Sequence, residues 1–237
     1  MALPATETVG TLDELPSALS RLGLAPPRPV LVLVGGASGL ERVVADGLLV
    51  LFRDRLAPLL DQLGAVVVDG GTDAGVMALM GQARRAARAR FPLLGVAARH
   101  TVRLPGGQAA TGAELEPNHS HRLLVPGRNW GDEIPWMTAV VNHLGAAGAR
   151  ATLVAAGGRI TLLDVEASLA DGRPTLLLAG SGGTADAIAR ASSSQRHPLV
   201  KVLPQSGGWR GLAAALTRSL AGGASPGPAV GQDVSRA

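Results

Sequence analysis

Residues 65–80 read AVVVDGGTDAGVMALM and combine the signals that decide the fold. Four apolar residues predict a buried strand that ends at Asp69, and the residue pattern after Gly75 predicts a helix. Two glycines and Thr72 lie between them. The first N–H groups of a helix have no partner within it, and the helix dipole favours an anion there. The stretch therefore predicts a β–turn–α unit whose turn can bind an anionic group.

Short aliphatic runs alternate with helical patterns along most of the chain. The expected strands are Val30–Val34, Ala65–Asp69, Leu93–Ala98, Arg122–Val125, Ala151–Ala156, Thr175–Ala179 and Val200–Leu203. The expected helices are Leu40–Leu63, Gly75–Arg90, Ile134–Ala146, Leu162–Asp171, Thr184–Ala191 and Gly208–Leu220. Strands that are apolar throughout are buried on both faces, as in a parallel sheet, and intervening helices form βαβ crossovers. We therefore expect an α/β fold of the Rossmann-like, doubly wound type, with a mainly parallel sheet and helices on both faces.

The expected organisation is one domain with two flanking segments. Residues 29–221 form the domain, residues 1–28 form a loose lead-in with one short helix, and residues 222–237, rich in Gly and small residues, form a disordered tail. The loop 99–120 is long and rich in Gly and polar residues, and long loops in compact domains are often functional.

Composition excludes several classes of protein. The chain has 237 residues, 46% of them hydrophobic, and it has no Cys and no Tyr. It therefore has an aliphatic core, no disulfide framework, no thiolate metal site and no Cys nucleophile. The apolar runs are shorter than the ~18 residues of a membrane span, and the N-terminus lacks the pattern of a signal peptide. We expect a cytoplasmic protein with no membrane contact.

The charge pattern does not favour nucleic acid as a partner. The net charge is +4, and the dense basic cluster is Arg84, Arg85, Arg88 and Arg90. These arginines lie at helical spacing, which is typical of a solvated helix face, and no aromatic residues for base stacking are interleaved with them.

Four glycine turns follow expected strands. Their candidate ligand-binding residues are Gly35, Gly36 and Ser38, then Gly70, Gly71, Thr72 and Gly75, then Gly157, Gly158, Arg159 and Thr161, and last Gly180, Ser181 and Gly182. All lie at the edge of the sheet where open α/β folds bind ligands. Each turn alone is also ordinary strand–helix turn chemistry. None matches a Walker phosphate loop or a dinucleotide fingerprint.

A second group of candidates follows the long loop. Asn118 and His119 could bind a ligand, or could close the loop through side-chain hydrogen bonds. His119 and His121 near carboxylates suggest a metal, but no third ligand has suitable spacing, so no metal is expected. Trp130 could stack on a nucleobase or serve as a core or lid residue.

Two carboxylates follow the third glycine turn. Asp164 or Glu166 could act as a general acid or base at a sugar–base bond. Alternatively, they complement the helix dipole, and Thr161 with Asp164 three residues later resembles a capping box.

Several motifs in order resemble a known family. They are GGTDAGVM, EPNHSHRLLV, GDEIP, the Gly157–Thr161 turn and GSGGTADAIA, within about residues 30–205. This combination is similar to the SLOG superfamily, in particular its prokaryotic LSDAT branch, relatives of the N-terminal domain of melastatin-type (TRPM) channels. The resemblance implies a Rossmann-like fold that binds a nucleotide-derived ligand such as ADP-ribose or NAD at the glycine turns. It also implies that Trp130 replaces an aromatic near the ligand and that Glu133 belongs to the matching E-I-P element.

The sequence also departs from its relatives. Met137 and Gly183 stand where some channels have arginines, and Ile160 stands where the family usually has Gly, although Arg159 could supply a replacement charge. The related phosphoribohydrolases carry P-G-G-x-G-T-x-x-E. Asp164 aligns with the final acid of that motif, whereas Ala156 and Ile160 replace its Pro and third Gly.

These observations lead to two main functional hypotheses. The first is a sensor that binds a nucleotide-derived ligand and signals to an effector protein. The alternative is an N-glycoside hydrolase acting on a nucleotide or NAD-like substrate. A carboxylate that points into the crevice favours the enzyme, and one that caps its own helix favours the sensor. The apolar helical segment 209–220 could mediate self-association, although a core helix has the same pattern.

Overall fold

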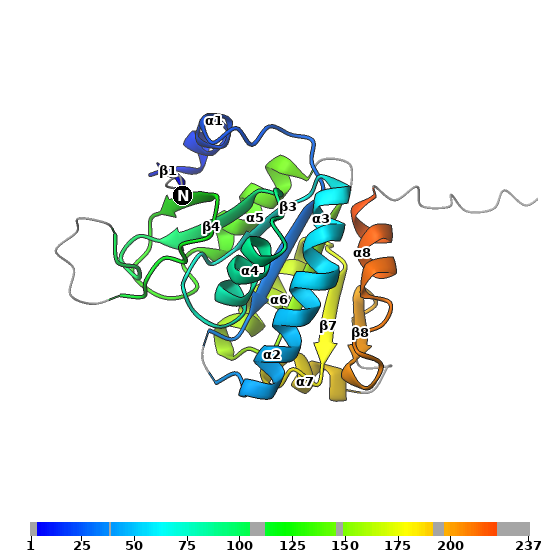
Figure 1. Ribbon diagram of the computed structural model, residues 1–237. Coiled ribbons are helices and arrows are strands. Elements are labelled where there is room, and N and C mark those ends of the chain that lie inside the picture. The colour runs from blue at the N-terminus through cyan, green and yellow to red at the C-terminus, as the bar shows by residue number, and fades with distance from the viewer. Residues whose placement is uncertain (1–3, 38, 105–111, 146–148, 192–196, 222–237) are drawn as a thin grey trace, which may run out of the picture.

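The computed structural model describes residues 4–37, 39–104, 112–145, 149–191 and 197–221. Ser38, Ala146 and the predicted tail 222–237 lie outside them. The described chain forms one parallel sheet in the order β1-β5-β4-β3-β2-β6-β7-β8 (Figure 1). Its strands are β1 Ala5–Thr8, β2 Val30–Gly35, β3 Val66–Asp69, β4 Leu93–Ala98, β5 His121–Val125, β6 Arg150–Ala155, β7 Thr175–Ala179 and β8 Val200–Pro204.

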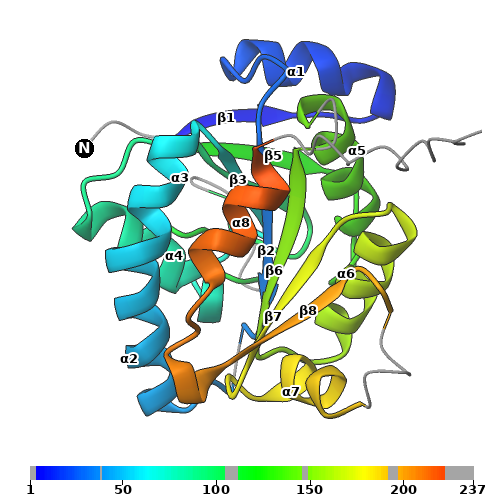
Figure 2. The ribbon, with the colours of Figure 1, turned by 90° about the vertical axis from the view of Figure 1, so that its right-hand side faces the viewer.

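Helices cover both faces of this sheet (Figure 2). One layer contains α2 (Arg42–Leu51), α3 (Ala57–Leu63), α4 (Gly75–Ala86) and α8 (Leu212–Leu220). The other contains α1 (Leu15–Arg21), α5 (Ile134–Leu144), α6 (Arg159–Ala170) and α7 (Gly183–Arg190). Short 3-10 turns lie at Leu12–Glu14 and Gln205–Gly207. The doubly wound α/β architecture is therefore confirmed.

The central strand β2 shows why the strands are apolar throughout. Leu31 and Leu33 pack into the core on the α2–α4 side, whereas Val30 and Val32 pack into the core on the α5–α6 side. Residues that alternate in direction along a strand thus meet an apolar layer on either face. Burial on both sides removes the polar alternation of a half-exposed strand.

The order in which strands are added to the sheet reverses at β2. From β2 the chain builds outward through β3, β4 and β5 on one side, and returns to build β6, β7 and β8 on the other. Gly35 of β2 pairs with Ala155 of β6, so the ends of these two strands lie side by side. Such a switch point leaves a crevice at the carboxyl ends of the strands.

The N-terminal segment differs from the expectation of a loose lead-in. It contains the expected short helix, α1, but also the edge strand β1, which pairs in parallel with β5 through Ala5 and His121. This strand, Ala-Thr-Glu-Thr, is largely exposed and lacks the apolar run that identified the other strands.

The expected helix 40–63 is interrupted. Between α2 and α3 lies a π-helical turn, Phe52–Leu56, in which the Ala57 N–H bonds to the Phe52 carbonyl. Pro58 follows at the start of α3 and has no N–H with which to continue the α-helical bonding. Wider π turns are a recognised way to absorb such a break.

Candidate ligand-binding cavity

A cavity of about 430 Å³ lies at the carboxyl ends of β2, β3, β4 and β6. Its volume is within the range of small-molecule sites, about 300–1,000 Å³. The expected residues that line it are Gly35, Gly36, Gly70, Thr72, Trp130, Glu133, Gly157, Gly158, Arg159, Thr161 and Asp164. Of the other candidates, Gly71, Gly75, Asn118, His119, Glu166, Gly180, Ser181 and Gly182 do not line it, and Ser38 lies outside the described residues.

The third glycine turn forms one wall of the cavity. Gly157 has a φ of +104°, and a Cβ there would lie 2.5 Å from Cγ2 of Thr161. Gly158 precedes α6 with extended backbone, and its carbonyl accepts the first helical bond from the Leu162 N–H. The next three amides, beginning with Arg159, therefore have no acceptor within the helix. The start of α6 therefore presents to the cavity a helix end of the kind that favours anions.

The fourth glycine turn supports the third turn instead of lining the cavity. The N–H groups of Thr184 and Ala185 donate to the carbonyls of Gly157 and Ala156, at 2.9 and 3.0 Å. The Ser181 hydroxyl accepts from the Ala156 N–H at 2.7 Å and donates to the Leu178 carbonyl at 2.5 Å. The first amides of α7 thus donate to the backbone of the neighbouring turn.

The residues of the second glycine turn have two roles, because some line the cavity and one packs against the first turn. Gly70 and Thr72 face the cavity, and the Thr72 hydroxyl lies 3.5 Å from the Met77 sulfur. Gly75, by contrast, packs so closely on the first turn that a Cβ would lie 1.7 Å from the Gly36 carbonyl oxygen. The Val76 N–H donates to that same carbonyl at 3.1 Å. The start of α4 is therefore partly used to hold the turn after β2.

His119 lies in a buried ionic cluster beneath the second turn. Its Nε2 lies 2.8 Å from Oδ1 of Asp69 and its Nδ1 lies 2.8 Å from Oε2 of Glu116. Glu116 also accepts from the backbone and side-chain amides of Asn118, and Asp69 accepts from the Gly71 N–H. Both ring nitrogens of His119 are thus engaged. Asn118 and His119 thus close the loop through side-chain hydrogen bonds, which is the second of the two roles expected from the sequence.

This environment shifts two pKa values in opposite directions. Burial alone lowers the pKa of His119, but the charges and hydrogen bonds of Asp69 and Glu116 outweigh it and raise the pKa to about 9. Burial raises the pKa of Glu116, but His119 and Asn118 outweigh that effect and lower it. His119 is therefore a cation held between two carboxylates at neutral pH.

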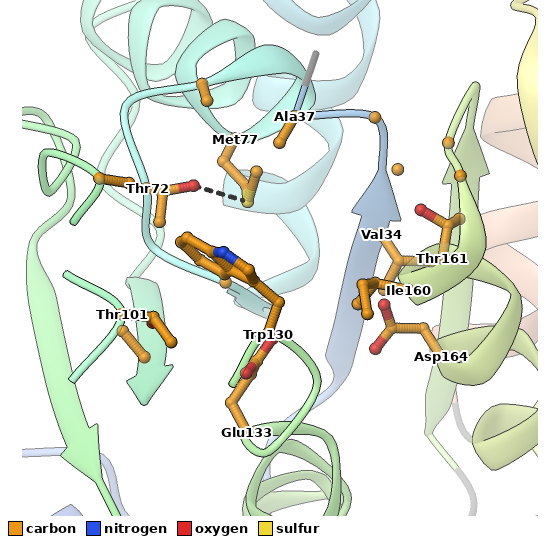
Figure 3. Close-up of a pocket in the computed structure, with 18 of the residues that line it drawn as sticks. Val34, Ala37, Thr72, Met77, Thr101, Trp130, Glu133, Ile160, Thr161 and Asp164 are labelled. Atoms are coloured by element: carbon orange, nitrogen blue, oxygen red, sulfur yellow. Dashed lines mark hydrogen bonds between the residues drawn. The ribbon is translucent and has the colours of Figure 1, made fainter. Parts of the chain in front are cut away.

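Two carboxyl groups enter the cavity from different parts of the chain. Glu133 precedes α5 and Asp164 lies on α6. Figure 3 shows Asp164 beside Ile160 on one wall and Glu133 beneath the Trp130 indole. Oε2 of Glu133 accepts the Gly131 N–H at 3.0 Å, which fixes its direction. These carboxyls are the main polar features of a cavity whose other walls are mostly apolar.

The pKa values of both carboxyls are raised. Burial and the nearby charge of Glu133 raise the pKa of Asp164 to about 7, against an opposing effect of the Arg173 charge. Burial raises the pKa of Glu133 more than its amide hydrogen bonds lower it. Ionisable groups perturbed by burial and a partner, within a cleft, are characteristic of functional sites.

Asp164 does not cap its own helix. α6 begins after Gly158 with no side-chain cap, and Thr161 is already its third helical residue, so the capping-box interpretation is wrong. Glu166 lies two residues beyond Asp164, is exposed and does not line the cavity. Because successive residues of a helix point about 100° apart, only one of the two candidate acids faces the cavity.

Trp130 lies at the mouth of the cavity. Its side chain remains 50% exposed, and its indole crosses the opening toward Thr72 and Met77 (Figure 3). Asp132 holds the loop by accepting the N–H groups of Arg128 and Asn129 at 2.8 and 3.0 Å. The indole therefore forms an aromatic edge over the cavity.

Some lining residues were not among the predicted ligand-binding residues. Met77 and Thr101 face the cavity, as does Met137, which was noted only as a departure from the channel relatives. Thr101 lies three residues after β4, where its hydroxyl donates to the Ala98 carbonyl at 2.8 Å. The rule that ligands bind beyond the carboxyl ends of strands could have identified Thr101, whereas an apolar helical residue such as Met77 carries no signal that separates it from the core.

The basic cluster does not form one continuous charged face. The Arg84 guanidinium donates to the carbonyls of Phe91 and Asn118, at 2.9 and 3.2 Å, and lies over the Phe91 ring. This arginine therefore holds the segment between α4 and β4 in place through hydrogen bonds.

In the described part of the chain, no helix is both long and apolar enough to cross a membrane.

Comparison with known proteins identifies the class. The family described as "SLOG in TRPM, prokaryote" matches residues 28–217. The chain therefore belongs to this family of SLOG domains. No curated protein matches this sequence.

The likeness to one solved structure, TM1055, supports the same fold. The X-ray structure of TM1055, a structural genomics target, is 20% identical with a TM-score of 0.51, covering 74% of this chain and 91% of that one. A molybdenum cofactor binding protein from Rippkaea orientalis is 14% identical with a TM-score of 0.46, covering 64% of this chain and 76% of that one. At this level of identity the likeness to TM1055 concerns the fold.

Proposed function

We propose that the cavity binds a nucleotide-derived ligand, related to ADP-ribose or NAD. The observation that carries this proposal is the juxtaposition of two different subsites in one cavity. The first turn of α6 offers free amides and Arg159, and the opposite side offers the Trp130 indole above apolar walls. A phosphate suits the former and an aromatic base the latter.

The departures from the channel relatives bear on the number of phosphates. Met137 is buried in the cavity wall, so its position supplies no cation. Gly183 has no room for a side chain, because a Cβ would lie 2.1 Å from the Gly157 carbonyl oxygen. This arrangement favours a ligand with few phosphate charges here, since each further charge needs a compensating donor.

A sensor role would extend this proposal. Ligand binding would then signal to an effector protein by shifting the chain between two states that differ in their affinity for the ligand.

N-glycoside hydrolysis is the second candidate, and the orientation of Asp164 favours it. Asp164 faces the cavity instead of capping α6, and its pKa of about 7 suits a general acid or base at neutral pH. In such a reaction the C1′–N bond breaks and the base leaves with the bonding electron pair. Water adds to C1′ and gives a proton to the Asp164 carboxylate, and a base that leaves as an anion takes that proton from the carboxyl.

A proton NMR time course with AMP, ADP-ribose and NAD separates these candidates. Broadened ligand signals without new peaks indicate binding alone. New peaks of free base and ribose, absent with Asp164→Asn, indicate hydrolysis. Thr72→Val should weaken the broadening, because it removes a hydroxyl from the cavity wall. If no ligand broadens and none is converted, the proposal is overturned.

A further inference from the structure

The cavity has an unusual distribution of charge for a nucleotide site. Among its described lining residues, the charged side chains are Glu133, Asp164 and Arg159. Arg159 is exposed at the first turn of α6, whereas Glu133 is only 8% exposed and Asp164 is half-buried. The buried, inner end of the cavity, at Glu133 and Asp164, is thus acidic, and its exposed, outer end, at Arg159, is basic.

The buried cation whose charge acts on Asp164 is already paired with another carboxylate. Arg173 is 2% exposed, and its Nε lies 3.1 Å from Oδ2 of Asp171. Its charge reaches Asp164 but does not line the cavity. From the cavity side, Asp164 and Glu133 therefore have no cationic partner among the described residues.

Two carboxyls in an apolar enclosure are costly when ionised and unpaired. A ligand that brings a positive charge or hydrogen-bond donors relieves this cost, whereas a phosphate there adds to it. The Trp130 indole, which lies above Glu133 and to one side of Asp164 in Figure 3, adds an aromatic ring whose face can attract a cation. The same indole also stacks on flat rings, so a flat cationic ring fits both features.

We propose that the inner end of the cavity selects a nucleotide whose base is a cationic heteroaromatic ring, held between Trp130 and the carboxylates of Asp164 and Glu133. The phosphate of this ligand lies outward, at Arg159 and the first turn of α6. This inference rests on the proposed function and names the chemical class of its ligand. An N-alkylpyridinium nucleotide and an N7-methylated purine nucleotide share this chemistry.

The test compares ligands that differ mainly in ring charge. Calorimetric titration of the full chain uses oxidised and reduced nicotinamide mononucleotide, and then 7-methylguanosine and guanosine monophosphates. We expect the cationic member to bind tighter by about tenfold or more. A preference confined to the first pair identifies the pyridinium as the source, and one confined to the second pair identifies the methylated purine.

Matched variants assign the preference to the carboxyls. Asp164→Asn and Glu133→Gln keep the side-chain volume and should each reduce the preference. Asp13→Asn removes the same charge from an exposed turn outside the cavity and should leave the preference unchanged. Circular dichroism confirms that the variants fold.

The possible failures are distinct. Equal affinity for both members of each pair overturns the cationic-base inference and leaves nucleotide binding in place. A preference that survives the double variant Asp164→Asn/Glu133→Gln also overturns it. If none of these ligands, nor AMP, ADP-ribose or NAD, binds at all, the proposed function fails together with the inference.

Discussion

Asp69 and His119 form a buried ion pair, with Oδ1 and Nε2 2.8 Å apart, that joins the end of β3 to the segment before β5. Glu116 holds the other ring nitrogen of His119 at the same distance. The pair lies directly below the turn that carries Thr72, since the Gly71 N–H donates to the same Asp69 oxygen. The cavity wall on this side therefore depends on a charged cluster that does not itself line the cavity.

The first prediction concerns the pH dependence of stability. The pKa of His119 is about 9 in the folded chain, against 6.5 as its ordinary value. A raised folded pKa gives stability that is complete below the unfolded pKa and is lost as pH rises through the folded one. Between about pH 6.5 and 9.5, the free energy of unfolding should therefore fall by roughly 3 kcal/mol through this group. Urea unfolding across this range measures the fall.

His119→Gln should remove most of that pH dependence. It should also destabilise the fold at neutral pH by about 3 kcal/mol or more, because two buried carboxylates lose their cation. His100→Gln, at an exposed histidine, serves as the control. A His119→Gln curve parallel to wild type at every pH would contradict the assignment.

The second prediction is that the cavity residue Asp164 lowers the free energy of unfolding as pH rises. The pKa of Asp164 is about 7 in the folded chain, above its ordinary value of 3.8. Ionisation is therefore disfavoured in the fold, and stability falls as pH rises between these values. Asp164→Asn should raise the free energy of unfolding on the order of 2 kcal/mol at about pH 8, with a gain that vanishes toward about pH 4. Thermal unfolding at both pH values, with Asp13→Asn as control, tests this. A gain of equal size at both would be inconsistent with it.

The third prediction uses Gly158 to block the cavity. Its backbone is extended, and a Cβ there meets nothing within 4 Å, so a larger side chain is tolerated without strain. Gly158→Leu should keep the unfolding midpoint near that of wild type and weaken nucleotide binding by about a hundredfold, because the side chain occupies the mouth of the site. Gly10→Leu, at an exposed glycine outside the cavity, is the matched control. Undiminished affinity in Gly158→Leu would place the ligand elsewhere.

The fourth prediction concerns Trp130. Its half-exposed indole covers the cavity, whereas Trp209 is buried and donates to the Ala179 carbonyl. Ligand binding should therefore quench the fluorescence of Trp130 while that of Trp209 remains. Trp130→Ala should lose this signal and bind about tenfold more weakly, with stability nearly unchanged because little packing is lost. Quenching that persists in Trp130→Ala would show that another tryptophan reports the ligand.

Much of the architecture followed from local patterns. Apolar runs such as Val30–Val34 identified the strands, and all but β1 were placed to within a few residues. Buried parallel strands carry this signal because both faces need apolar side chains. The exposed edge strand β1 lacks it. The π turn before Pro58 also escaped, since a helix-length apolar pattern does not show where the bonding widens.

The site divided along a different line. The sequence by itself determined that glycine turns gather at the carboxyl edge of a parallel sheet, because strand direction and crossover handedness follow from the order of elements. Only the tertiary structure decided that Gly157 and Gly158 line the cavity while Ser181 supports them, and that Asp164 enters it beside Glu133 while Glu166 does not. The reason is physical. Periodicity along the chain records which faces are apolar, but the direction in which a polar side chain points is set by the rotation of its helix against distant neighbours.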